Sequence, residues 1–469
     1  MKVILALLFS SLWISSSAST YKVGPSREYV SPNALYLANV VQDGDTIEID
    51  GETYIGTSAL AEWKQNNLLI KGVNGRPKLD ADNKYILGKG IWVLAGNNIV
   101  VENIEFFGAI VPDKNGAGIR LDGIGMSVRN CFFHDNENGI LTSNPHAGEI
   151  LIEYSEFANN GHGDGFSHNL YIGHVDKLTF RFNYSHHTKI GHNLKTRARI
   201  NIISYNRIMD EESGNSSRLI DISNGGFSIV KGNLFMQGDN APNKNMIGYG
   251  LEGLSSSVTS EFYFINNTLV NKRTGSCLFL DINEGTSTLL VANNIFTGSG
   301  EVYNGTIAEM KNNLIEPSIS SLDFTNEAQY EYNLNSASTA IDYGIDLAPV
   351  KGYSLIPDSI YIHPTDFGIR TIENNVIDAG AYEYTSTVSL LDIPGDNFLV
   401  YPNPSSDRIN IDMDASQVNK LEIYDTLGEV ILTGSDTNTL NISSLTDGLY
   451  FLVVEMKNGS MLSELVIKH

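Results

Sequence analysis

The sequence predicts an all-β chain in two parts, a long parallel β-helix and then a small β-sandwich, and the first evidence is a repeat. A strand-like apolar run followed by asparagine or a similar residue, one variable residue and an apolar residue occurs nine times, centred on Ile104, Cys131, Ser155, Asn183, Asn206, Asn233, Asn267, Asn294 and Asn313. A period in the range of about 20–50 residues indicates a repeat architecture. Because the units are rich in strand-forming residues and contain no amphipathic helix, they favour a parallel β-helix over leucine-rich or helical arrays.

Asparagine at one place in each coil has a physical role in such a fold. Stacked coils repeat at about 4.8 Å, so amide side chains can hydrogen-bond from coil to coil as a ladder. Asparagine also tolerates the left-handed backbone that tight turns require. We therefore expect coils from about Tyr21 to Asn313.

The N-terminus has the features of a secretory signal peptide over residues 1–19. Lys2 gives the positive start, residues 3–14 form a short apolar core, and residues 17–19 are small residues suited to cleavage. The apolar run is shorter than the roughly 20 residues that a membrane span needs, and no later segment reaches that length. We expect an exported protein with no membrane span.

The composition argues against some classes of function. The chain has 54 acidic and 31 basic residues and a formal net charge of −23, which argues against general binding of nucleic acid. Cys131 and Cys277 lie several predicted coils apart, beyond the reach of a disulfide, so we interpret both as packing residues. We expect a monomer.

After the last repeat the pattern changes. The repeat fades over residues 316–384, which we interpret as a closing segment, so the β-helix with this segment spans residues 20–384. Residues 385–397 lack periodicity and are predicted to be a linker. Residues 398–469 contain alternating strands separated by Gly, Asn and Asp turns, which predict the β-sandwich.

A basic stretch inside the repeats stands out against the acidic chain. Residues 177–209 contain no acidic residue and seven basic ones, namely Lys177, Arg181, Lys189, Lys195, Arg197, Arg199 and Arg207. Six of the ten histidines lie in or just before it: His162, His168, His174, His186, His187 and His192. A solvated face normally mixes both signs, so the stretch indicates a site for an anion, and an acidic polysaccharide is the natural partner.

Aligning the coils predicts how these residues meet. Residues 137–144, 167–174 and 191–198 can be stacked on one another. Strand side chains alternate between faces, so if Leu170 and Leu194 point into the core, five residues point outward together. They are Asn169, Tyr171, Asn193, Lys195 and Arg197. Tyr171 then lies next to Lys195, and the following coil brings Asp221 beside them with Arg218 at its edge.

This arrangement suits a lyase acting on a uronate. Removing the proton next to a carboxylate requires that the carboxylate charge be neutralised, which Arg197 or Arg199 can do. Lys195 is the candidate base, because neighbouring cations favour its neutral form. Either Tyr171 or a histidine donates a proton to the leaving oxygen; the candidate histidines are His168, His187 and His192. We expect Asn169, Asn193, His168, Arg199, Asp221 and Arg218 to bind substrate.

Several alternatives stay open. A uronate C5-epimerase begins with the same proton abstraction, and a glycoside hydrolase would use Asp221, Asp164 or Glu212 as its acids. A non-catalytic adhesin needs only the basic groove. No cofactor is required and the histidines lack the spacing of a zinc motif, although residues 210–212, Asp-Glu-Glu, leave a Ca²⁺ site open.

Both parts of the chain also resemble known families. The segments NGAGIRLDG, FFHDNENGIL, NGHGDGFSHNLYIG, SHHTKIGHNLK and DISNGG resemble secreted bacterial right-handed parallel β-helix proteins related to pectate and alginate lyases. The opening NALYLANVVQDGDTIEIDGETY resembles the start of such proteins, where a short helix caps the first coil. The C-terminal module resembles the type IX secretion sorting domain of Bacteroidetes. That resemblance implies the type IX machinery as a partner, passage through the periplasm, and a secreted or surface-attached protein.

Overall fold

The computed structural model describes residues 18–385, 400–425, 430–435, 437–457 and 461–468, and the chain divides into two compact units after Tyr384. The expected signal peptide, apart from its last two residues, lies outside the described residues. The expected linker, apart from Thr385, also lies outside them. Among the described residues, no helix is long and apolar enough to cross a membrane.

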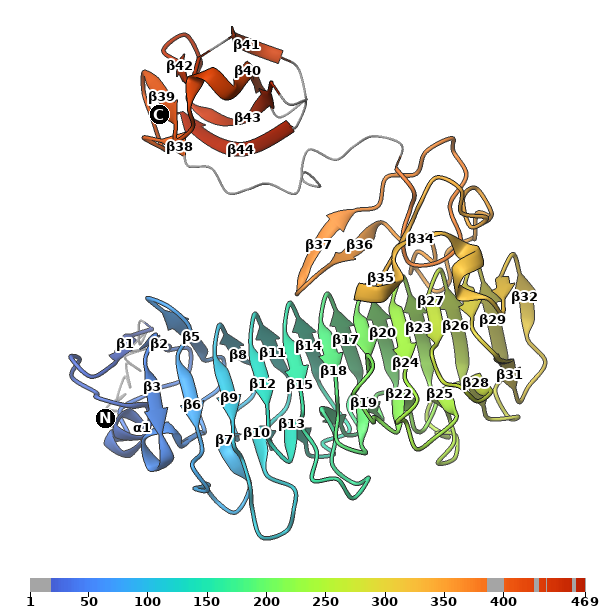
Figure 1. The fold of residues 1–469 in the computed structure, drawn as a ribbon. Helices are drawn as coiled ribbons and strands as arrows, with labels where there is room; N and C mark the ends of the chain where they lie inside the picture. Colours follow the sequence, from blue (N-terminus) through green and yellow to red (C-terminus); the bar gives the residue numbers. More distant parts are fainter. Residues whose placement is uncertain (1–17, 386–399, 426–429, 436, 458–460, 469) are drawn as a thin grey trace, which may run out of the picture. The chain divides into compact units, whose positions relative to one another are not determined.

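The first unit is a parallel β-helix, in which successive coils contribute strands to three sheets of 12, 11 and 10 strands (Figure 1). Sheet A contains β1 (Thr20–Val23), β2 (Thr46–Asp50), β5 (Leu69–Val73), β8 (Ile99–Glu102), β11 (Met126–Arg129), β14 (Glu149–Glu153), β17 (Lys177–Arg181), β20 (Ile200–Ser204), β23 (Phe227–Lys231), β26 (Glu261–Ile265), β29 (Thr288–Ala292) and β32 (Glu309–Lys311). Sheet B contains β3 (Thr53–Ile55), β6 (Lys78–Asp80), β9 (Glu105–Phe107), β12 (Phe132–His134), β15 (Glu156–Ala158), β18 (Tyr184–His186), β21 (Arg207–Met209), β24 (Leu234–Gln237), β27 (Thr268–Asn271), β30 (Ile295–Thr297) and β33 (Leu314–Glu316). Sheet C contains β4 (Ala61–Trp63), β7 (Gly90–Leu94), β10 (Ala117–Leu121), β13 (Asn138–Thr142), β16 (Leu170–Ile172), β19 (His192–Thr196), β22 (Arg218–Ile222), β25 (Asn245–Tyr249), β28 (Cys277–Ile282) and β31 (Gly300–Asn304).

The predicted asparagine ladder is present at the corner between sheets A and B. The side-chain amide of Asn206 donates to Asn233 Oδ1 at 2.9 Å, and the amide of Asn233 donates to Asn267 Oδ1 at 3.0 Å. The same Oδ1 atoms accept the backbone N–H of the coil before, so each amide satisfies buried groups of two coils. The residue before each repeat position has a left-handed backbone conformation, as at Tyr205 (φ 57°) and Asn266 (φ 49°). The ladder therefore explains why the repeat keeps asparagine.

Apolar side chains fill the interior of the β-helix in stacked rows. The rings of Phe106, Phe133 and Phe157 stack from coil to coil with centroids 4.9 and 5.0 Å apart. The short helix α1 (Pro32–Ala38) covers the first coil, as the resemblance implied, and Ser31 caps its N-terminus. Cys131 and Cys277 are buried and free. The 3-10 turn η1 (Gly56–Ala59) lies near α1.

The closing segment covers two of the three sheets. It contains η2 (Ile319–Leu322), β34 (Phe324–Asn326), η3 (Glu327–Gln329), β35 (Glu331–Leu334), β36 (Ser359–Ile362) and β37 (Asp366–Ile369). Its Tyr332 and Tyr361 pack on outward residues of sheet B, and its Leu355 packs on Phe227 and other outward residues of sheet A. Neither of these two apolar clusters includes a residue of sheet C. The outer face of sheet C is therefore left for the site.

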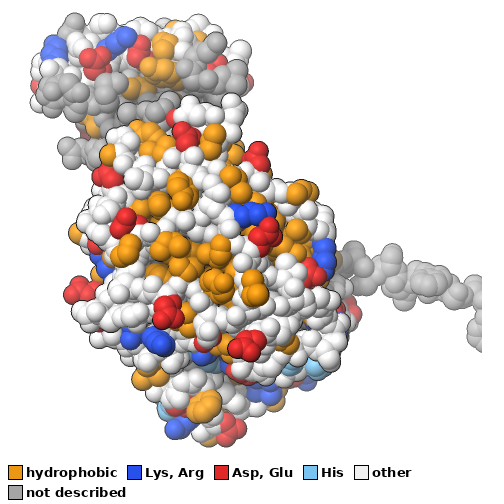
Figure 2. Space-filling view, turned by 90° about the vertical axis from the view of Figure 1, so that its right-hand side faces the viewer, with side chains coloured by type: hydrophobic (Ala, Val, Ile, Leu, Met, Phe, Trp, Pro, Cys, Tyr) orange, Lys and Arg blue, Asp and Glu red, His pale blue; other side chains and the backbone are white. Residues whose placement is uncertain are grey.

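The last coil of the β-helix presents apolar side chains to solvent. Ile307 is 92% exposed and Ile315 is 52% exposed. In Figure 2, which views this end of the molecule, hydrophobic side chains gather on the visible face.

The second unit consists of two antiparallel sheets on one core, which confirms the predicted β-sandwich. One sheet contains β38 (Val400–Tyr401), β39 (Arg408–Ile411) and β42 (Thr439–Asn441). The other contains β40 (Val418–Tyr424), β41 (Val430–Ser435), β43 (Gly448–Met456) and β44 (Met461–Lys468), and η4 (Ala415–Gln417) precedes β40. Side chains of both sheets share a core, including Ile409 and Leu452, each 0% exposed.

Candidate functional site

The register of sheet C places three of the predicted site residues in one row. Tyr171 of β16 pairs with Lys195 of β19, and Lys195 pairs with Asp221 of β22. Leu194, one residue before Lys195, is 0% exposed and belongs to the interior core. Because side chains alternate along a strand, Lys195 lies on the outer face of the sheet, as expected.

Lys195 lies on the outer face but is enclosed by its neighbours. Lys195 as a whole is only 9% exposed. Its Nζ lies 2.5 Å from Glu252 Oε1 and 3.5 Å from Asp221 Oδ2, and it is 5.6 Å from the centre of the Tyr171 ring. The groups nearest its ammonium are thus carboxylates. The interpretation from the sequence, that cations crowd Lys195, was therefore wrong.

Arg197 extends the site along the same strand. Its Nε donates to the Tyr171 hydroxyl at 2.8 Å, and its Nη1 donates to Asn224 Oδ1 at 2.6 Å. Its Nη2 forms an ion pair with Glu252. Burial alone would lower the pKa of Arg197, but its bonds to Tyr171 and Glu252 raise that pKa above the ordinary arginine value.

Glu252 therefore joins the two cations. Its carboxylate binds Lys195 through one oxygen and Arg197 through the other. Burial alone would raise its pKa, but the hydrogen bonds from the two cations lower that pKa below the ordinary glutamate value. The Glu252 side chain remains 43% exposed, whereas those of Lys195 and Arg197 are 11% and 16% exposed. The carboxylate thus sits at the mouth of the site.

Asp221 holds the inner side of the site. It is 1% exposed, and its Oδ2 accepts a hydrogen bond from the Ser223 hydroxyl at 2.7 Å. Arg218 Nη1 lies 3.4 Å from Asp221 Oδ1, and His192 Nε2 lies 3.9 Å from Asp221 Oδ2. Direct contact between Asp221 and a polysaccharide, as the sequence predicted, does not fit this burial.

The two histidines next to this row are buried. His168 and His192 stack with ring centroids 4.9 Å apart and are 2% and 7% exposed. Burial lowers the pKa of His192 to about 3, and burial with the charges of its neighbours holds the pKa of His168 well below its ordinary value. Burial therefore favours the neutral form of both imidazoles. Direct contact between His168 and a substrate, as the sequence predicted, does not fit its burial.

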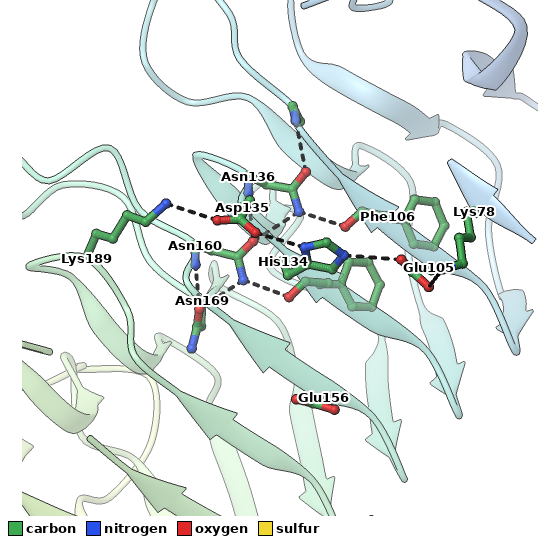
Figure 3. Close-up of polar contacts among 12 residues, drawn as sticks. Lys78, Glu105, Phe106, His134, Asp135, Asn136, Glu156, Asn160, Asn169 and Lys189 are labelled. Atoms are coloured by element: carbon green, nitrogen blue, oxygen red, sulfur yellow. Dashed lines mark hydrogen bonds and ion pairs between the residues drawn. The ribbon is translucent and has the colours of Figure 1, made fainter. Parts of the chain in front are cut away.

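The expectation that Asn169 and Asn193 point outward is wrong. Both are 0% exposed and belong to a second amide ladder, at the corner between sheets B and C. Asn160 Nδ2 donates to Asn169 Oδ1 at 2.9 Å, and Asn169 Nδ2 donates to Asn193 Oδ1 at 3.0 Å. Figure 3 shows Asn136, Asn160 and Asn169 in this ladder, with His134 bonded to Asp135 and Glu105 nearby. The chain bends here, and β16 begins only at Leu170, so strand alternation does not apply to Asn169.

His187 lies in the turn before β19, and Arg199 lies in the turn after it. His187 follows β18, and its ring contacts His186 Nδ1 at 2.7 Å and Ser213 Oγ at 3.0 Å. These contacts do not join it to Lys195, so the structure does not bring it into the site. Arg199 lies two residues after Arg197 and forms an ion pair with Asp176 at 3.1 Å.

Of the alternative acids, Asp221 lies in the site, whereas the contacts of Asp164 and of the residues considered for Ca²⁺ lie elsewhere. Asp164 accepts the backbone N–H of Phe166 within its own loop at 3.0 Å. Asp210 is fully buried, and burial raises its pKa to about 7. The Glu211 carboxylate accepts a hydrogen bond from the Tyr184 hydroxyl. Among the described residues, no group of three or more His, Cys, Asp or Glu side chains is arranged to hold a metal ion.

Sequence reasoning missed Glu252 and Asn224, although one signal was present. The interval between the repeats at Asn233 and Asn267 is the longest of the series, which marks a coil with an enlarged turn. Glu252 is the only acidic residue between positions 245 and 260. The turn after β25 carries it over the sheet toward Lys195.

Comparisons with known proteins agree with this architecture. Residues 399–468 match the family of secretion system C-terminal sorting domains, which confirms the expected sorting domain and indicates a protein that is secreted or attached to the cell surface. No curated protein matches the sequence. The crystal structure of pectate lyase Pel9A is similar to the structure of this chain, with a TM-score of 0.52 and 12% identity over 79% of this chain and 97% of that one. At this identity the likeness shows the fold alone.

Proposed function

We propose that this protein is a secreted polysaccharide lyase that cleaves an acidic, uronate-containing polysaccharide by β-elimination. The observation that carries the proposal is that Lys195 and Arg197 bind the same carboxylate, that of Glu252. A site that binds one carboxylate with two cations has the chemistry to hold the carboxylate of a uronate. Neutralising that charge is the main requirement for removing the proton on the adjacent carbon.

The roles of the residues follow from their positions. Arg197 holds the substrate carboxylate through its planar fork and stabilises the negative charge that develops there. Lys195 takes the proton from the adjacent carbon; the electron pair forms a carbon–carbon double bond, and the glycosidic carbon–oxygen bond breaks. Tyr171, whose hydroxyl is held by Arg197 at 2.8 Å, donates a proton to the leaving oxygen.

The proposal requires Glu252 to move aside. Its carboxylate occupies the position that the substrate carboxylate takes, and its exposed turn allows it to leave. A nearby carboxylate also favours the charged form of a lysine, so the departure of Glu252 removes one group that opposes the basic form of Lys195. Substrate binding and activation of the base are then coupled.

A glycoside hydrolase is the second candidate, because two carboxylates, those of Asp221 and Glu252, both meet Lys195. The burial of Asp221 at 1% exposure disfavours it, since both hydrolase carboxylates must reach the sugar. A C5-epimerase shares the first step of the proposed lyase. It would take up solvent deuterium without cleaving the chain.

The test is to incubate the protein with alginate, pectate and glycosaminoglycans and to analyse the products by absorbance and mass spectrometry. A lyase yields unsaturated ends that absorb in the ultraviolet. New reducing ends without that absorbance indicate a hydrolase instead. Binding with no product from any polymer, in wild type and variants alike, indicates an adhesin.

A further inference from the structure

A cleft of about 220 Å³ includes Arg197 in its lining and lies at the ends of five consecutive strands of sheet C. The turns after β13, β16, β19, β22 and β25 line it. This volume is smaller than the roughly 300–1,000 Å³ of pockets that enclose a whole drug-sized ligand. The cleft therefore suits one unit of a longer molecule.

Part of the cleft is lined by small residues. They are Ala198, Gly225 and Gly226. Gly226 has φ 100°, and a Cβ there would lie 2.4 Å from the carbonyl oxygen of Arg199. Any other residue would be strained and would clash with the backbone of the preceding coil, so this turn of the lining requires glycine.

Its walls are polar and carry positive charge. On one side the rings of His146 and His174 stack with centroids 4.9 Å apart, and Arg199 donates to the carbonyl oxygen of His146 at 3.2 Å. Burial, and then the charges of His146, Arg197 and Arg199, lowers the pKa of His174. The opposite wall is formed by the serines at positions 255–257. Within the described part of the chain, no carboxylate lines the cleft, although Asp176 pairs with Arg199 from outside it.

The cleft is continuous with the proposed lyase site. The Arg197 guanidinium lines the cleft and also binds Glu252. Asn224 joins the two walls, because it accepts from Arg197 at 2.6 Å and its backbone carbonyl accepts the N–H of Ser255 at 2.9 Å. A chain molecule held at Lys195 would pass directly into the cleft.

We propose that this cleft is a second saccharide subsite, which binds the acidic sugar unit next to the one held by Lys195 and Arg197. Arg199 meets the acidic group of that unit, and His174 and the serines meet its hydroxyl groups. The protein then recognises two consecutive units of a polyanion. This inference rests on the proposed function for the first unit, but binding to the cleft is measurable without turnover.

The first test fills the cleft. Ser256 is exposed on the wall, so Ser256→Trp blocks the cleft without disturbing the core, and Thr259→Trp, exposed on the same turn but outside the cleft, is its matched control. The second test removes a charge. Arg199→Gln is matched by Arg181→Gln on sheet A, since both arginine side chains are about two-fifths exposed (41% and 43%) and paired with a carboxylate.

The measurement is calorimetric binding of acidic oligosaccharides, from disaccharide to hexasaccharide, prepared from polygalacturonate, alginate and hyaluronate. Ser256→Trp and Arg199→Gln are expected to weaken binding of the hexasaccharide about tenfold, and the two controls to leave it unchanged. A single acidic monosaccharide is expected to bind all four variants equally.

The outcomes separate this inference from the proposed function. Loss of binding in Ser256→Trp and Arg199→Gln supports the subsite even if no polymer is cleaved. If the polymer is cleaved by wild type and both variants match their controls, the subsite is refuted while the lyase stands. If no acidic oligosaccharide binds the wild type, the subsite is refuted as well.

Discussion

Glu252→Gln is the substitution that best separates a displaceable carboxylate from a catalytic one. Glutamine keeps the shape of the side chain but removes the charge that binds Lys195 and Arg197. In the proposed mechanism the substrate carboxylate must displace Glu252 before it can bind. Removing the charge of this internal competitor is therefore expected to tighten binding of acidic oligosaccharides.

The magnitude follows from the exposure of the three side chains. Hydrogen bonds to charged groups contribute about 1.5–3 kcal/mol when buried, and exposed ion pairs contribute about 0.2–1 kcal/mol. Glu252 lies between these cases, because it is 43% exposed while its two partners are nearly enclosed. An interaction of about 1–2 kcal/mol corresponds to binding about five- to thirtyfold tighter. The free energy of unfolding should fall by a similar 1–2 kcal/mol.

The assay is calorimetric titration with the same acidic oligosaccharides, combined with denaturant unfolding. Glu309→Gln is the control, because Glu309 forms a half-exposed ion pair with Lys311 in the last coil, away from the site. The gain in affinity should shrink at high salt, which screens the competing charges. Weaker binding by Glu252→Gln would refute the displacement mechanism. Unchanged affinity with abolished turnover would instead identify Glu252 as the acid or base.

Four further predictions address the base, the core, a buried carboxyl group and the two units. Lys195→Arg keeps the charge beside Asp221 but cannot act as a base, so turnover should fall about a hundredfold or more while binding persists. Leu194→Ala should instead lower the free energy of unfolding by about 2–5 kcal/mol. A large loss of stability in Lys195→Arg with none in Leu194→Ala would mean that the strand register is wrong. Because burial raises the pKa of Asp210 to about 7, its carboxyl stabilises the fold at low pH, and this contribution is lost as pH rises from about 4 to 7. Asp210→Asn should remove this loss of stability, which amounts to about 1 kcal/mol per pH unit. The same pH dependence of the free energy of unfolding in both proteins would contradict this. Deleting residues 385–469 should leave the β-helix folded and any catalysis intact but abolish export in the native host, and normal secretion with lost glycan affinity would indicate a binding module instead.

The parts of the fold that repeat could be predicted from the sequence. Asparagine at one position in successive coils predicted the ladder that runs through Asn206, Asn233 and Asn267. The same period predicted the row of Tyr171, Lys195 and Asp221, because residues at equal places in successive coils must stack.

The corners and the long turns could not be predicted in this way. Asn169 follows the alternation of a strand in the sequence, but the chain bends before Leu170 and turns its amide inward. Glu252 reaches Lys195 from a turn whose path is set by tertiary contacts, not by the coil period. The burial of His168 likewise follows from its neighbours on three coils. No single stretch of sequence reveals it.

The measurement that tests the central proposal most directly is the ultraviolet absorbance of products from wild type, Lys195→Arg and Arg197→Lys on a panel of uronate polymers. Wild type is expected to give unsaturated products from at least one polymer, and either variant almost none, while both variants still bind that polymer. New reducing ends without absorbance, or equal product from wild type and Lys195→Arg, would contradict it.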